Sequence, residues 1–192
     1  MANTLVCGVG INNLIGESGS PIYKIWRNML SRCYRKDYVE TNPSHKAGTV
    51  CKDWLIYSNF KSWVEMQGWK KGWQIDKEII CKDNLIFNPD MCVMVPIGIS
   101  NLLMDSKAIR GKCSLGVTYV KQGDKYEAKL KINGTKKFLG VFKNEADAYE
   151  AYIKAKSDYI IKMANSLKDI RIREGLIRHA YKIMTSKIED KL

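Results

Sequence analysis

The sequence predicts an α+β fold in which a largely helical N-terminal module precedes a three-stranded antiparallel sheet, one helix packed on that sheet and a C-terminal helix. Two observations carry this prediction. Residues 125–133 alternate between apolar and polar side chains, as in a strand with one buried face. Residues 144–159 then repeat alanine and tyrosine at helical spacing.

The predicted sheet is a hairpin with one further strand before it. Asn133 and Gly134 suit the positive-φ positions of a tight turn between residues 125–133 and 135–142. The β-branched and aromatic run at residues 115–120 supplies the first strand. The middle strand has Tyr126, Ala128, Leu130 and Ile132 on one side and Lys125, Glu127, Lys129 and Lys131 on the other. The last strand is expected to place Lys137, Leu139 and Val141 on one side and Lys136, Phe138 and Phe142 on the other.

A helix is expected to follow the third strand and to cover the apolar side of the sheet. Asn144 can cap it, and Glu145 and Asp147 suit the positive end of the helix dipole. The stripe expected against the sheet consists of Ala148, Ala151, Tyr152, Ala155 and Tyr159.

The opposite side of the sheet is expected to be strongly basic. Residues 110–143 contain many lysines and arginines but only two acidic residues, Asp124 and Glu127. Such a surface attracts phosphate groups. Lysines on the open side of a small sheet also keep it soluble and prevent edge pairing, and that interpretation stays open beside the first.

Four segments of this region resemble the ethylene-response-factor (AP2/ERF-like) DNA-binding domain of plant transcription factors, whose relatives occur in phage and bacterial proteins with HNH modules. They are Leu115-Gly116-Val117, residues 126–131, residues 138–142 and residues 148–152. The resemblance implies that the sheet enters the major groove. Leu115, Thr118 and Val120 stand where the family usually has arginines. The residues expected to contact nucleic acid are Arg110, Lys112, Thr118, Lys125, Lys129, Lys131, Lys136 and Phe138.

Length and charge restrict the function further. At 192 residues the chain suffices for one or two small domains. A net charge of +12 and a pI near 9.4 favour nucleic acid as the partner, with a membrane surface as the competitor. No apolar run approaches the roughly 20 residues of a membrane span, and the start lacks a signal-peptide pattern. We therefore expect a cytoplasmic protein with no membrane partner, whose scattered cysteines stay reduced.

The N-terminal module is expected to begin with a helix at Ser20-Pro21, an N-cap followed by a favoured first helical residue. Arg27, Arg32, Arg35 and Lys36 extend the positive charge along this helix, or simply form its solvated face.

A second resemblance concerns the end of this module. Ile75-Asp76-Lys77, Asn88-Pro89-Asp90, residues 92–95 and a helix bearing Asn101 are similar to the strand, strand and helix of an HNH site, as found in phage-type HNH homing endonucleases. The expected organisation is an N-terminal arm or irregular edge at residues 1–20, the HNH-like ββα module at 21–105, a linker at 106–112, the ERF-type domain at 113–167 and an amphipathic helix at 168–192.

The HNH resemblance implies a divalent ion and a histidine general base. Asp76 stands at a metal-ligand position, and Asn101 can supply the ligand on the helix. Lys77 stands where the base belongs, and a protonated lysine cannot accept a proton. His45 is the candidate for a substitute base. Asp76 can equally be a strand-end residue paired with a neighbouring lysine.

We expect foremost a phage-encoded protein of the host cytoplasm that binds double-stranded DNA through the basic sheet. It would need no cofactor, and its HNH-like module would grip phosphates without cutting. One alternative is an active HNH-type homing endonuclease or nickase that uses Mg²⁺ or Mn²⁺. A second is an effector that binds a host nucleic-acid-processing protein. In the C-terminal helix Ile177, Tyr181, Met184 and Ile188 form a stripe that either packs back on the chain or joins a homodimer.

Overall fold

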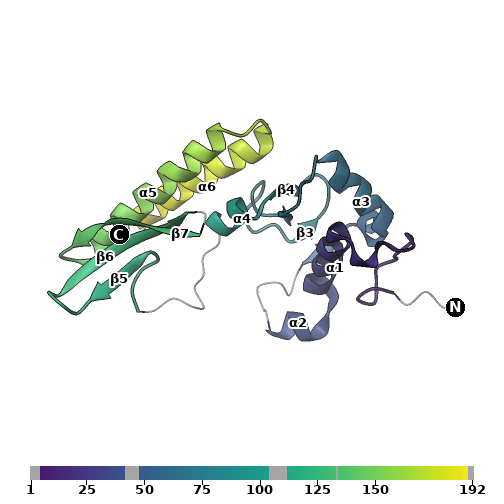
Figure 1. Ribbon diagram of the computed structural model, residues 1–192, viewed down its shortest axis with the longest axis horizontal. Coiled ribbons are helices and arrows are strands. Elements are labelled where there is room, and N and C mark those ends of the chain that lie inside the picture. Colours follow the sequence, from purple (N-terminus) through teal and green to yellow (C-terminus); the bar gives the residue numbers. More distant parts are fainter. Residues whose placement is uncertain (1–4, 42–47, 104–111, 133, 190–192) are drawn as a thin grey trace. The chain divides into compact units, whose positions relative to one another are not determined.

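The computed structural model describes residues 5–41, 48–103, 112–132 and 134–189. The chain divides into two compact units, Met1–Ile97 and Gly98–Leu192. The first combines helices with pairs of short strands, and the second contains a three-stranded antiparallel sheet and two long helices (Figure 1). The structure therefore confirms the predicted α+β class.

The first unit is built from short helices and two strand pairs. Its elements are η1 (Glu17–Gly19), α1 (Pro21–Tyr34), α2 (Lys36–Thr41), β1 (Thr49–Val50), η3 (Lys52–Leu55), α3 (Tyr57–Met66), β2 (Trp73–Asp76), β3 (Ile86–Phe87) and β4 (Val93–Pro96). Strand β1 pairs with β3 in parallel, and β2 pairs with β4 antiparallel. Helix α4 (Ile97–Leu103) follows β4 directly in the chain.

Helix α1 begins where the sequence predicts. The Oγ of Ser20 accepts a hydrogen bond from the backbone N–H of Tyr23 at 3.1 Å, which satisfies one of the free N–H groups of the first turn. Pro21 occupies the first helical position, where no N–H is needed. The buried face of α1 consists of Ile22, Tyr23, Trp26, Met29 and Leu30.

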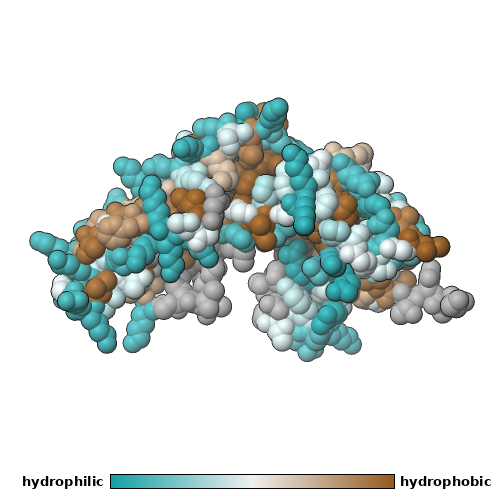
Figure 2. All heavy atoms as spheres, viewed as in Figure 1, coloured by the Kyte–Doolittle hydropathy of each residue, from teal (hydrophilic) through white to brown (hydrophobic). Residues whose placement is uncertain are grey.

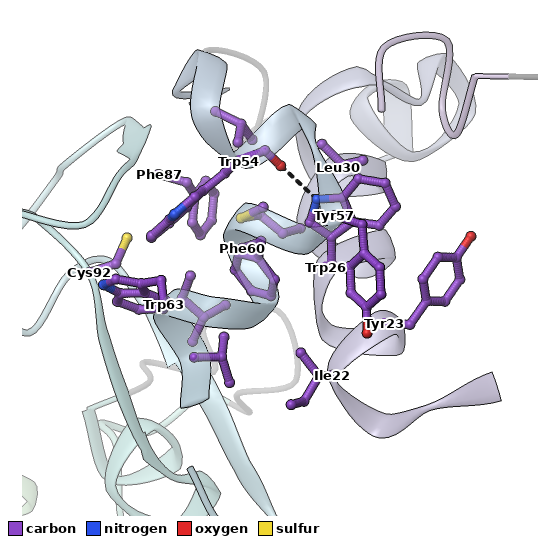
Figure 3. Close-up of a cluster of buried hydrophobic side chains, with 14 of the residues drawn as sticks. Ile22, Tyr23, Trp26, Leu30, Trp54, Tyr57, Phe60, Trp63, Phe87 and Cys92 are labelled. Carbon is purple, nitrogen blue, oxygen red and sulfur yellow. Dashed lines mark hydrogen bonds between the residues drawn. The ribbon is translucent and has the colours of Figure 1, made fainter. Parts of the chain in front are cut away.

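The core of the first unit is rich in aromatic side chains (Figure 3). Trp26, Tyr57 and Phe60 are completely buried, and the ring centroids of Trp54 and Trp63 lie 4.5 Å apart. The indole N–H of Trp26 donates to the carbonyl of Trp54 at 2.6 Å, so burial leaves this polar group satisfied. These contacts hold α1, η3 and α3 together.

The N-terminal segment packs against this core. Ile11 forms a β-bridge with Ile56, and Val6, Cys7 and Val9 lie partly buried against the aromatic cluster. The segment predicted as an arm or irregular edge is therefore, from Val6 on, part of the first unit's packing.

In the second unit, one helix packs against both the sheet and the other long helix (Figure 1). The sheet has the order β5 (Val117–Val120), β6 (Lys125–Ile132) and β7 (Thr135–Phe142). Helix α5 (Glu145–Asn165) covers one face of it, and α6 (Ile170–Glu189) packs on α5. The predicted cap is confirmed, because Asn144 Oδ1 accepts from the backbone N–H of Asp147 at 2.8 Å.

The chain just before β5 approaches α5 very closely at Gly116. A Cβ atom on this residue would lie 2.0 Å from Cδ2 of Tyr152, and the backbone has a φ of +77°. Only glycine satisfies both conditions at low cost. The ring of Tyr152 can therefore pack directly on the backbone that leads into the sheet.

Helix α6 packs through a face other than the predicted stripe. Tyr181 and Met184 of that stripe are 57% and 42% exposed. The predicted stripe and the face that actually packs both have helical spacing, so the helical period alone does not choose between them. The small Ala180 permits close contact with α5, where the hydroxyl of Ser157 donates to its carbonyl at 3.3 Å. The buried residues of α6 include Ile172, Leu176 and Ala180.

Candidate nucleic-acid interface

The strand register divides the side chains of the sheet between two faces. Ala128 and Leu130 of β6 are buried in clusters with residues of α5, so the alternate residues point to the opposite side, the open face. Across β6 and β7, Lys129 lies opposite Phe138 and Lys131 lies opposite Lys136. By this register the open face consists of Thr118, Val120, Lys125, Glu127, Lys129, Lys131, Lys136, Phe138 and Val141.

A β-bulge in β7 determines which residues complete the open face. Lys129 pairs with Phe138, whereas Ala128 pairs with Gly140, which leaves Leu139 as the extra, unpaired residue of the bulged strand. A bulge of this kind exchanges the two sides of a strand beyond it. Leu139 is partly buried against the core under α5.

The predicted sides of the last residues of β7 were therefore wrong. Val141 lies on the open face and is 51% exposed, while Phe142 packs against the buried cluster. Strict alternation had placed them the other way round. In the sequence, Gly140 was the signal that could have indicated the bulge, since a glycine inside a strand often marks one. In the structure its φ is +145°.

Four lysines dominate the charge of the open face, and the single carboxylate Glu127 opposes them. The ammonium of Lys129 lies 2.7 Å from Glu127, so part of its charge is neutralised. Lys131 and Lys136, both exposed, lie directly opposite each other. Like charges in such a pair destabilise the sheet, and a bound polyanion would relieve that repulsion.

Apolar groups lie between these charges. Phe138 is 55% exposed beside Lys129, and Val141 is similarly exposed. Figure 2 shows apolar patches among hydrophilic side chains over the part of the second unit that holds the sheet. The open face therefore offers ammonium groups for phosphates together with apolar contacts for base or sugar edges.

The first strand contributes little charge to the open face. Thr118 is exposed opposite Glu127. Lys112 is exposed ahead of the strand, and Arg110 lies outside the described residues. Of the predicted contact residues, the structure gathers Thr118, Lys125, Lys129, Lys131, Lys136 and Phe138 on one face.

In the region predicted to resemble an HNH site, Asp76 closes a turn at the end of β2. Its Oδ1 accepts hydrogen bonds from the backbone N–H groups of Glu78 at 2.8 Å and Ile79 at 3.0 Å. This geometry supports the structural interpretation that the sequence left open, because the carboxylate satisfies the turn that follows the strand.

Lys77 acts as a hydrogen-bond donor. Its ammonium contacts the carboxylate of Glu78 at 3.1 Å and donates to the carbonyl of Asn84. The side chain is only 13% exposed. In both contacts the amine is the hydrogen-bond donor, so this arrangement suits an anion-binding group better than a general base.

Asn101 and His45 are the other residues predicted for metal binding or catalysis. Asn101 is exposed on α4 and belongs to the second unit, whereas Asp76 belongs to the first. His45 lies outside the described residues. Within residues 5–41, 48–103, 112–132 and 134–189, no group of three or more His, Cys, Asp or Glu side chains is arranged to hold a metal ion.

The six cysteines are free thiols. Burial raises the pKa of Cys33 to about 11 and that of Cys92 to about 12. Thiols of this kind are poor nucleophiles at neutral pH.

Comparisons of the chain with protein-family models, curated proteins and solved structures returned no match. Among the described helices, none combines the length and apolar character needed to cross a bilayer.

Proposed function

We propose that this protein binds double-stranded DNA by laying the open face of its second unit in the major groove, while the first unit adds phosphate contacts. The observation that carries the proposal is the direct pairing of Lys131 with Lys136. Two exposed like charges held opposite each other cost stability in the free protein. Phosphates from the DNA backbone offset that cost on binding.

The chemistry of the open face also suggests what kind of recognition it provides. Lysine binds phosphate as a point charge, and it discriminates bases less well than the bidentate guanidinium of arginine. Most of the affinity should then be independent of sequence. Phe138 and Val141 can add apolar contacts, for which the methyl group of thymine is the natural partner in the major groove.

A gel mobility shift on random duplex DNA, repeated over a range of salt concentrations, tests the proposal. Lys131→Ala and Lys136→Ala should each weaken binding. Each should also reduce the slope of the logarithm of the binding constant against the logarithm of the salt concentration, by about 0.9 for each phosphate that the protein no longer neutralises. Lys137→Ala is the matched control, because Lys137 is exposed but lies opposite Leu130, on the α5 side of β7. Equal effects of all three substitutions would contradict the proposed face.

The same protein preparation separates the alternatives. Nicking of supercoiled plasmid with Mg²⁺ or Mn²⁺, abolished in Asp76→Ala, would favour the nuclease hypothesis. Co-purification of a host protein that survives nuclease treatment and high salt would favour the effector hypothesis.

A further inference from the structure

Arg32 lies in the last turn of α1, and the fold leaves its guanidinium incompletely satisfied. Its Nε is buried and has no hydrogen-bond acceptor in the described part of the chain. Nor does any described carboxylate form an ion pair with it. Buried N–H donors nearly always have a partner, so one without a protein acceptor points to an ion or water.

A second cation approaches the same aromatic ring. The guanidinium carbon of Arg32 lies 5.2 Å from the ring centroid of Phe87, and the ammonium of Lys77 lies 6.0 Å from that centroid. Phe87 is buried and belongs to the aromatic core (Figure 3). Helix α1 and the turn after β2 therefore bring two positive charges, far apart in sequence, to one buried ring.

The electrostatics of Cys33 show that both charges act on one region. Burial is the main influence and raises the pKa of this thiol to about 11, while Arg32 and Lys77 both act to lower it. Lys77 has a partial counterion in Glu78, whose side chain is 54% exposed. Such a solvated ion pair contributes little free energy, so a phosphate group can replace the carboxylate.

We propose that Arg32 and Lys77 form a phosphate-binding site on the first unit, whose ligand is a phosphodiester of nucleic acid; this choice of ligand rests on the proposed duplex binding. The guanidinium fork matches two phosphate oxygens, and the ammonium adds a point charge. Packing on Phe87 fixes the guanidinium before binding, which lowers the entropic cost of ordering it.

The site can be tested without DNA. In protein labelled with ¹⁵N-arginine, the Nε–H signal of Arg32 is followed during titration with inorganic phosphate, against sodium chloride at equal ionic strength. Phosphate should shift this signal to saturation. Lys77→Met should weaken the apparent affinity roughly tenfold, the value of one charged hydrogen bond. Arg27→Gln, an exposed change on the same helix, should have no effect.

A second measurement connects the site to DNA. Arg32→Lys keeps the positive charge but removes the forked guanidinium, and Arg32→Gln removes both. The DNA affinity measured by mobility shift should therefore be lower for Arg32→Lys than for the parent protein, and lower again for Arg32→Gln. The salt slope of Arg32→Gln should decrease by about 0.9, and that of Arg27→Gln should not. Circular dichroism of each variant verifies that the fold is retained.

The two proposals can fail separately. If neither the parent protein nor any variant binds duplex DNA, the proposed function fails, while a saturable phosphate shift would still support the site. If phosphate shifts the Arg32 signal no more than chloride does, the site is refuted. The site is also refuted if phosphate binds Lys77→Met and the parent protein with equal affinity. Both conclusions hold whatever the DNA result.

Discussion

Lys136→Glu should make the protein more stable and a weaker DNA binder. The substitution converts the directly opposed Lys131 and Lys136 into an ion pair on the exposed end of the hairpin. Opposite charges at such positions stabilise a sheet, whereas like charges destabilise it. A surface optimised only for folding would therefore carry an acid here.

The size of the effect follows from the exposure of the pair. Both side chains are exposed, so screening keeps the gain in the free energy of unfolding to about 0.2–1 kcal/mol. Because the same substitution replaces a phosphate-attracting charge by a repelling one, the salt slope of binding should fall by at least about 0.9.

The assay pairs urea denaturation with mobility shifts, each at low and high salt. Lys137→Glu is the control, since it makes the same change in net charge opposite the apolar Leu130. The stability gain should be specific to Lys136→Glu and should shrink in high salt. A loss of stability in Lys136→Glu, or equal binding losses in both variants, would refute the argument.

Three further predictions concern the scaffold. Gly116→Ala should lower the free energy of unfolding by about 2–5 kcal/mol, measured in urea, because positive φ and the contact with Tyr152 both oppose a Cβ atom; an effect below about 1 kcal/mol would contradict the close approach. Asp76→Ala should cost about 1–2 kcal/mol and Asp76→Asn clearly less, because asparagine keeps the oxygen that accepts both backbone N–H groups; equal costs would favour a role for the charge itself. Hydrogen bonds from the hydroxyl and backbone N–H of Ser114 lower the pKa of Glu145 below its usual 4.5. The stability they provide is therefore complete above about pH 4.5 and is lost as the pH falls through the lowered value, so pH-dependent urea titrations of Glu145→Gln should lack this component.

The sequence predicted the sheet well where its pattern is local. The strict period of two in residues 125–133 and the Asn133-Gly134 turn signal led to β6, β7 and the side of the four open-face lysines. The cap at Asn144 was equally visible, because capping depends on residues that are close in the chain.

Features decided by distant contacts were not predictable in this way. Val141 reaches the open face because Leu139 turns into the core, and this exchange depends on packing under α5. Arg32 looked like one of several cations on a solvated helix face. Its buried Nε depends on Phe87, which lies on a strand much later in the sequence. The packed face of α6 likewise depends on its contact with α5.

The extra residue in β7 adds a side chain to the core without taking a place on the open face. Loss of a single codon at Leu139 would remove the bulge but keep the register, because Phe138 and Gly140 already pair with Lys129 and Ala128. Val141 would stay on the open face and Phe142 on the buried side. The turn, the preceding lysines and the capped helix would all keep their places. One in-frame deletion would thus remove a partly buried side chain from the core and leave the outer surface of the sheet unchanged.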